Sequence, residues 1–162
     1  MAKIKTANQN GKYSDAEAKT DVIAYILNPY KAIHGFVGGI GVNPECPAES
    51  MEVVSETFGK SNGVQLRHYI ISFSQDELTD SRIANAIAQR LTAYIGQEFQ
   101  AVYAVHENKA YLHVHIVVNT VSFVDGHRWR GSKAEFYHLI DAVKQILHGF
   151  NINRLEYIPT KH

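Results

Sequence analysis

The chain has 162 residues, enough for one domain with a substantial core. Its hydrophobic content of 45% and charged content of 20% are ordinary for a globular protein. Sixteen basic residues balance sixteen acidic ones. Because phosphate neutralisation drives nonspecific binding to nucleic acids, this balance argues against a generally basic DNA-coating protein but allows a local basic groove.

Cysteine content and hydropathy limit the class of protein further. Cys46 is the only cysteine, so the chain has no internal disulfide and no zinc ribbon. The sequence has no apolar run of about 18 or more residues and no secretion signal, so we expect a cytoplasmic protein with no membrane insertion. The nine histidines are the unusual feature of the composition, and their positions are more informative than their number.

The first half of the chain predicts two helices separated by polar and glycine-rich segments. Residues 1–13 are polar, and we expect a short extended arm. Residues 16–27 are expected to form a helix that ends before Pro29, because proline disfavours the helical conformation of the residue preceding it. The glycine-rich residues 35–41 are expected to form a turn and a strand, and residues 48–57 a second helix.

The second half predicts strands and helices in mixed order. Residues 66–73 are β-branched and aromatic, which favours a strand. Residues 79–94 place apolar side chains at helical spacing. The remaining predicted elements are a hairpin through residues 107–111 between strands at 100–106 and 112–121, a helix at 133–147, and a strand or tail at 151–158. This mixture predicts one α+β domain spanning residues 1–162.

Three histidines in the predicted hairpin are the most informative group. Alternate side chains of a strand share a face, so His113, His115 and Asn119 are expected to point to one side. His106 ends the preceding strand, and the hairpin would bring it near His113. Three converging imidazoles that leave open coordination positions are typical of a catalytic metal; the alternative is a set of surface histidines. The opposite face is expected to be apolar, with Leu112, Val114, Ile116 and Val118 in the core.

A catalytic metal at this position would be a divalent ion. Imidazole suits several transition metals, and manganese or magnesium would also serve a phosphoryl oxygen. Such an ion acts as a Lewis acid that polarises a phosphate. The component still missing from the sequence pattern at this point is a nucleophile.

Four segments, taken in order, are similar to the motifs of a known family. Residues 24–31 (AYILNPYK) place a helical tyrosine before an Asn-Pro-x-Lys turn, and residues 68–73 form a strand that ends in Ser-Phe. Residues 106–119 contain the histidines and Asn119, and residues 120–126 continue through Ser-Phe to Asp-Gly. Over about residues 15–150, the chain resembles the plasmid and transposon mobilisation relaxases, which are HUH endonucleases.

The resemblance implies a five-stranded antiparallel sheet flanked by helices, and an enzyme that cuts one phosphodiester at an origin of transfer. Its substrate would be a DNA hairpin with a single strand. By position, Tyr25 would attack and become linked to the 5′ phosphate, and His106, His113 and His115 would hold the metal. The family further implies a bacterial cytoplasmic protein with accessory relaxosome proteins and a coupling protein as partners. We expect the chain to be the N-terminal nicking part of a longer protein.

The chain departs from the family pattern near the first metal histidine. Relatives commonly carry an acid two residues after it, where this chain has Asn108. We expect Asn108, Glu107 and Asn119 to support the metal ligands by hydrogen bonding. Some relatives attack with histidine, and Tyr25 is also compatible with simple helix packing. Two other candidate nucleophiles therefore stand beside it, Tyr30 and His34.

Basic residues near an aromatic side chain are candidates for DNA contacts. Arg128, Trp129, Arg130 and Lys133 form the densest basic segment, which suits a phosphate track with base stacking. A solvated turn with a packed tryptophan is an equally good interpretation. Lys31 of the tyrosine motif is a further candidate. A second basic group lies on the N-terminal arm, at Lys3, Lys5 and Lys12, and His68 is a candidate for either the site or a structural role.

Two other functions are compatible with this pattern. A rolling-circle replication initiator or transposase of the HUH class often carries its tyrosine on a helix after the histidine motif, where Tyr137 stands, whereas Tyr25 and Tyr94 precede the motif. A metal-binding or DNA-binding module without catalysis would need the histidines but no nucleophile.

Overall fold

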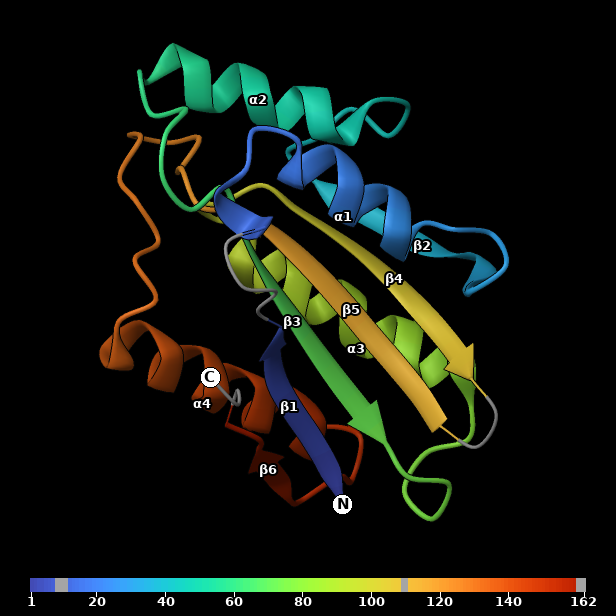
Figure 1. Cartoon of the computed structure of the whole chain (residues 1–162). Coiled ribbons are helices and arrows are strands. Elements are labelled where there is room, and N and C mark those ends of the chain that lie inside the picture. The colour runs from blue at the N-terminus through green and yellow to red at the C-terminus, as the bar shows by residue number, and fades with distance from the viewer. Residues whose placement is uncertain (8–11, 109–110, 160–162) are drawn as a thin grey trace.

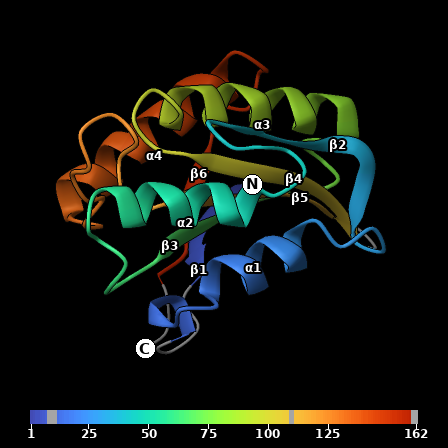
Figure 2. The ribbon, with the colours of Figure 1, turned by 90° about the horizontal axis from the view of Figure 1, so that it is seen from above.

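The computed structural model describes residues 1–7, 12–108 and 111–159, and the side chains of Lys12 and Asn108 are outside this description. The chain forms an α+β domain built on one six-stranded sheet (Figure 1). The strand order is β2-β4-β5-β3-β1-β6. Helices α1 and α2 lie on one side of the sheet, and α3 and α4 lie on the other (Figure 2).

Except at the N-terminus, the helices and strands follow the order expected from the sequence. The strands are β1 (Ala2–Ala7), β2 (Ala32–Ile40), β3 (Leu66–Phe73), β4 (Ala101–Asn108), β5 (Tyr111–Asn119) and β6 (Leu155–Tyr157). The helices are α1 (Ala18–Ile26), α2 (Pro47–Thr57), α3 (Ser81–Ile95) and α4 (Lys133–His148), with a short 3-10 helix, η1, at Lys12–Ser14.

The expected five-stranded antiparallel sheet is wrong in strand number and in one pairing. The N-terminal arm is a strand, β1, which pairs antiparallel with β3. Residues 155–157 add a sixth strand, β6, which pairs in parallel with β1. The parallel pairing follows from the long connection through α4, because a chain that crosses a sheet face by a helix can return in the same direction.

The face covered by α3 and α4 holds the larger apolar core. Leu112, Val114, Ile116 and Val118 of β5 are buried there with Ile87 and Leu91 of α3, which confirms the predicted alternation along β5. This packing is the main support of the sheet, since burial of apolar side chains is the largest favourable contribution to folding.

The face covered by α1 and α2 holds a smaller core and one buried lysine. Ile23 and Ile26 of α1 pack against the sheet in this second cluster. Lys19 of α1 is only 1% exposed, and its ammonium donates to Ser55 Oγ at 2.8 Å and to Gln65 Oε1 at 3.3 Å. Helix α1 is therefore fixed to both α2 and the sheet, and the last turn of α1 reaches the histidine-bearing end of β4.

In the described part of the chain, none of the helices combines the length and apolar character needed to cross a membrane.

Candidate active site

The three histidines of the predicted hairpin line one cavity of about 360 Å³. Strands β4 and β5 pair so that His106 lies directly opposite His113, as the sequence predicts. His115 follows two residues later on the same face of β5, and its ring centre is 4.1 Å from that of His106. The ring centres of His113 and His115 are 6.2 Å apart. The hairpin therefore gathers the three imidazoles at one end of the sheet.

Tyr25 enters the same cavity from α1. Its ring centre lies 6.3 Å from that of His106 and 6.2 Å from that of His115, in edge-on arrangements. The side chain is 46% exposed, so it is reachable from solvent, unlike the neighbouring Ile23 and Ile26, which are buried in the core. Tyr25 therefore lies on the open side of its helix and does not serve mainly to pack it.

Two lysines add positive charge to this cavity. The Lys31 ammonium lies 4.4 Å from the centre of the Tyr25 ring, in a cation–π contact. Lys5 of β1 lines the cavity from the neighbouring strand. Both lysines were DNA candidates in the sequence, and both lie where they could face a phosphate beside Tyr25.

Hydrogen bonds from outside the cavity hold two of the imidazoles. His106 donates from Nε2 to the Ile26 carbonyl at 2.7 Å, and this carbonyl lies at the end of α1 where no helical donor follows. His115 Nδ1 is 2.9 Å from Nε2 of His68, and His68 Nδ1 is 3.1 Å from the Tyr13 hydroxyl. The side chains of Tyr13, His68 and His115 are all buried.

Burial keeps these imidazoles neutral. It lowers the pKa of His115 to about 2 and that of His68 to about 4, and the neighbouring His106 adds to both shifts. The pKa values of His106 and His113 are also lowered, again mainly by burial. A neutral imidazole has a lone pair available for a metal, whereas a protonated one does not.

The donor set suits a divalent metal in its chemistry, but the side chains are not arranged as a finished metal site. In the described ranges, no three His, Cys, Asp or Glu side chains are placed so that together they could hold an ion. His106 is turned toward the Ile26 carbonyl, and His115 is engaged with His68. Three neutral imidazoles around one polar cavity nevertheless fit a transition-metal ion, provided that their rings reorient.

Comparison with known proteins identifies the family of this chain. A family model described as "Relaxase: MobA/VirD2-like, nuclease domain" matches residues 25–152, which begin at Tyr25 and include all three histidines. The chain belongs to this relaxase family. The expected family is thereby confirmed over most of the sequence.

Curated relatives are relaxases and transfer proteins. "Protein rlx" of Staphylococcus aureus is 32% identical over 48% of this chain and 24% of its own length. The "Group II intron-interrupted relaxase LtrB" of Lactococcus lactis is 32% identical over 62% of the chain and 20% of its own length. "Protein TraI" of Escherichia coli is 35% identical over 46% and 11% of the two lengths. Matched segments therefore span a quarter or less of these relatives.

One solved structure shares the fold. It is described as "Molecular Basis of Vancomycin Resistance Transfer in Staphylococcus aureus" and superposes with a TM-score of 0.52 over 82% of this chain and 77% of the other. Sequence identity is 11%, so the likeness concerns the arrangement of helices and strands.

The rival nucleophiles of this relaxase domain lie at different distances from the histidines. Tyr30 lines the same cavity and is 96% exposed. His34 is exposed on β2 and is not part of the cavity lining. Tyr94 and Tyr137 lie on α3 and α4, on the other side of the sheet (Figure 2). The tyrosine that follows the histidine motif is therefore separated from it by the sheet.

The three residues expected to support the metal ligands are placed differently from one another. Glu107 is exposed and lines the histidine cavity. The Asn108 side chain lies outside the described part of the structure. Asn119 shares the face of His115 but is bonded elsewhere, since its amide donates to Met51 O at 3.2 Å and to Gln100 Oε1 at 2.9 Å. Its hydrogen bonds fix α2 to the sheet.

The basic segment after β5 divides into structural and exposed residues. Arg128 donates to the Asn62 carbonyl at 2.7 Å, and the Trp129 ring packs 5.1 Å from that of Phe99. Arg130 and Lys133 remain exposed. The packed-turn interpretation therefore describes Arg128 and Trp129, while Arg130 and Lys133 are free to meet a ligand.

The sequence did not predict the hydrogen-bonded series Tyr13–His68–His115. His68 was a candidate with two interpretations, and its place beside His115 depends on the pairing of β3 with β5. Tyr13 gave no signal, because η1 is only three residues long and has no periodicity. A weak signal for His68 was present in its strand position, on the same face as Ile70 and Ser72, which line the histidine cavity.

Proposed function

We propose that this chain is a nicking domain that cuts one DNA strand at an origin of transfer by transesterification through Tyr25. The observation that carries the proposal is the position of the Tyr25 ring, within 6.3 Å of the rings of both His106 and His115 in one cavity. A tyrosine, neutral imidazoles and two lysines in one place form a site suited to phosphoryl transfer.

In the proposed reaction the Tyr25 oxygen attacks the scissile phosphorus. A Tyr–O–P bond forms and the bond to the 3′ oxygen breaks, which leaves a 5′-phosphotyrosyl adduct and a 3′ hydroxyl. The phenol gives up one proton and the leaving 3′ oxygen takes up one, so the step is neutral overall. The Lys31 ammonium, 4.4 Å from the centre of the Tyr25 ring, would stabilise the negative charge of the phosphate as Tyr25 attacks.

His106, His113 and His115 are the proposed ligands of a divalent ion, manganese or magnesium. When bound, this ion would supply Lewis-acid stabilisation of the phosphate charge. If His115 binds it through Nε2, then Nδ1 carries the proton and donates to His68 Nε2. His68 must then carry its own proton on Nδ1 and donate to the Tyr13 hydroxyl. His68 and Tyr13 are thus proposed positioning residues for His115.

The proposed substrate is origin-of-transfer DNA, a hairpin followed by a single strand. Lys5 and Lys31 would meet the scissile phosphate. Accessory relaxosome proteins and a coupling protein are the proposed partners in the bacterial cytoplasm, and residues 1–162 would be the N-terminal part of a longer relaxase. The relatives extend well beyond the matched segment, which supports a longer protein.

Covalent capture from a randomised pool tests the proposal and needs no defined origin sequence. The 162-residue chain is incubated with Mn²⁺ and a pool of single strands that carry a randomised central segment. Unlinked DNA is removed under denaturing conditions, and the strands that remain are amplified and sequenced. We expect an enriched cleavage sequence with the wild-type chain and none with Tyr25→Phe.

Two controls separate the roles of the nucleophile and the histidines. Tyr94→Phe, on the far side of the sheet, is expected to capture the same strands as wild type. The double variant His113→Ala, His115→Ala is expected to lose the adduct while retaining noncovalent binding of the enriched strand. Full capture by Tyr25→Phe would overturn the proposal.

A further inference from the structure

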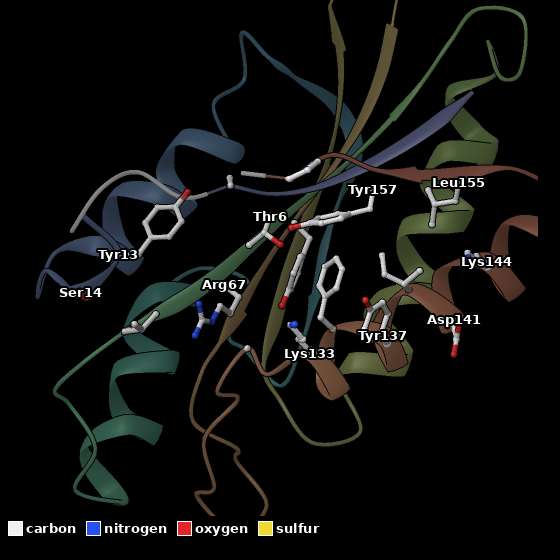
Figure 3. Close-up of a pocket in the computed structure, with 17 residues that line it drawn as sticks. Thr6, Tyr13, Ser14, Arg67, Lys133, Tyr137, Asp141, Lys144, Leu155 and Tyr157 are labelled. Carbon is white, nitrogen blue, oxygen red and sulfur yellow. The ribbon is translucent and has the colours of Figure 1, made fainter. Parts of the chain in front are cut away.

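A second, larger cavity of about 700 Å³ lies at the edge of the sheet formed by β1 and β6 (Figure 3). Its walls come from the ends of β1 and β3, from α4 and from β6. In β3, Arg67 and Tyr69 line it, whereas the alternate residues His68 and Ile70 face the other side of the sheet. None of the catalytic residues proposed above lines this cavity.

The walls of this cavity are rich in aromatic rings. The rings of Phe136 and Tyr157 lie 4.6 Å apart, and Tyr69 is almost fully buried in the wall. Tyr137 and Tyr157 are 63% and 42% exposed, respectively. In Figure 3, Tyr157 and Tyr137 lie on opposite sides of the space that the sticks surround. Accessible aromatic rings of this kind provide surfaces on which a planar ligand can stack.

The charged residues of the cavity are mainly cationic. Arg67, Lys133 and Lys144 line it, against the single carboxylate of Asp141. A local excess of positive charge in a chain of zero net charge favours an anionic ligand.

Arg67 is held in place and retains hydrogen-bonding capacity. Its Nη2 donates to the Arg130 carbonyl at 3.0 Å. Gly131, at a φ of +71°, leaves room for it, because a Cβ there would lie 3.0 Å from the guanidinium. The buried Nε of Arg67 has no acceptor among the described residues. A fixed guanidinium with donors to spare is well suited to a phosphate.

Three neighbouring cavities around β1 share lining residues. Lys5 and Tyr25 line both the histidine cavity and a middle cavity of about 480 Å³. Ala7 and Tyr13 line both the middle cavity and the aromatic one. The middle cavity also contains two carboxylates, Asp15 and Asp21. Cations therefore concentrate in the two outer cavities and acids in the middle one.

We infer that the aromatic cavity binds one nucleotide of the single DNA strand whose scissile phosphate lies at Tyr25. The base would stack on Tyr137 and Tyr157, and its phosphate would be held by Arg67 and Lys133. Aromatic walls alone would suit an apolar ligand, and cations alone would suit a simple anion. A nucleotide uses both, because its base stacks on the aromatic rings and its phosphate pairs with the cations. The volume is within the range of about 300–1,000 Å³ of small-ligand pockets. This inference rests on the proposed function.

The only tryptophan of the chain reports on this cavity. The Trp129 ring lies 6.2 Å from the ring of Tyr69, which forms part of the cavity wall. The probe is a fluorescein-labelled strand of twenty deoxythymidines for anisotropy, and the unlabelled strand for Trp129 emission. We expect saturable binding with a change in Trp129 emission at the same midpoint.

The decisive variant is the pair Tyr137→Leu, Tyr157→Leu, and the matched control is the exposed Tyr94→Leu. We expect the pair to weaken strand binding by at least about fivefold, the effect of losing one stacked base, and to abolish the emission change. We expect the control to bind as wild type does.

Lys133→Ala combined with Lys144→Ala is expected to reduce the salt dependence of binding, because fewer phosphate contacts release fewer counterions. Thermal unfolding of each variant shows whether the fold is retained.

The outcomes separate this inference from the proposed function. Wild-type strand affinity in a folded Tyr137→Leu, Tyr157→Leu variant would overturn the inference, even if covalent capture succeeds. An unchanged emission response in Tyr25→Phe supports the inference, even if capture fails in wild type. Thymidine monophosphate is tested alone, because a free nucleotide offers the same base and phosphate as the strand. If it changes Trp129 emission while the strand does not, the cavity takes a free nucleotide and the assignment to the strand is wrong.

Discussion

At the scale of single residues, the site depends on which atom of each imidazole carries the proton. The Ile26 carbonyl can only accept, so it fixes a proton on Nε2 of His106. The Tyr13–His68–His115 series has no carboxylate, although an acid commonly orients metal-binding histidines. In the proposed metal site, a neutral histidine backed by a phenol takes this orienting role.

Replacement of His68 tests that role. We expect His68→Ala to weaken Mn²⁺ binding by about 10–100-fold, because the His115 ring loses the partner that orients it. His68→Gln is expected to recover part of the affinity, since its amide oxygen can accept a hydrogen bond from His115 Nδ1. Isothermal titration calorimetry measures both, with the exposed His138→Ala as control. Equal Mn²⁺ affinity of His68→Ala and wild type would contradict the assignment.

The metal-ligand candidates were predictable at this scale, but their partners were not. Strand alternation places His113 and His115 on one face, and a hairpin places His106 opposite, so local sequence is sufficient. The position of His68 beside His115 requires the pairing of β3 with β5, which joins residues 47 positions apart. A single sequence carries no local signal for such a contact.

At the scale of helices and strands, α1 positions the proposed nucleophile, Tyr25. Tyr25 lies on the exposed side of this helix, while Lys19, almost two turns earlier, is buried and bonded to Ser55 of α2 and to Gln65, just before β3. Burial lowers the pKa of Lys19, and the nearby Glu52 carboxylate at 3.8 Å acts in the opposite direction. The buried ammonium thus fixes the first half of α1, and the second half of the helix reaches the histidines.

Shortening this side chain tests the fixing of α1. We expect Lys19→Ala to lower the free energy of unfolding by about 2–4 kcal/mol, because it leaves a cavity and removes the donor to Ser55 and Gln65. Lys19→Met keeps the volume and is expected to cost less. Lys3→Ala, at an exposed position of β1, should change stability by no more than about 0.5 kcal/mol. Urea unfolding measures all three, and a Lys19→Ala effect as small as that of Lys3→Ala would refute this account of α1.

Most helices and strands were predictable, and the exceptions were short or at an edge. The long helices α3 and α4 have clear helical spacing, and β3 and β5 are rich in β-branched residues. Strand β6 has only three residues, and its parallel partner is at the opposite end of the sequence. Its pairing with β1 is a consequence of tertiary structure, which is why the sequence left residues 151–158 as either a strand or a tail.

At the scale of the whole molecule, the sheet separates two environments. Figure 2 shows the helices on the two sides of the sheet. The face covered by α3 and α4 carries the large apolar core, and the other face carries the neutral histidines. Burying several imidazoles in neutral form makes the stability of the fold depend on pH, because the unfolded chain binds protons that the folded chain does not.

Metal-free protein is therefore expected to lose stability in mild acid. The pKa of His68 is lowered from about 6.5 in the unfolded chain to about 4 in the fold, and that of His115 is lowered further. Their contribution is fully present above pH 6.5 and is lost as pH falls through the window down to pH 4. Urea unfolding at several pH values in the presence of a chelator is expected to show this decline, and a smaller one for His68→Gln. A flat profile over this window would contradict the burial of neutral histidines.

The central claim is that Tyr25, beside the histidine cavity, forms the covalent bond to DNA. Its most direct test is to digest the adduct captured with Mn²⁺ using a protease and a nuclease, and to locate the remaining nucleotide by tandem mass spectrometry. The account predicts a 5′-phosphate-linked nucleotide on the peptide that contains Tyr25. A nucleotide on Tyr30, or on Tyr137 across the sheet, would contradict it.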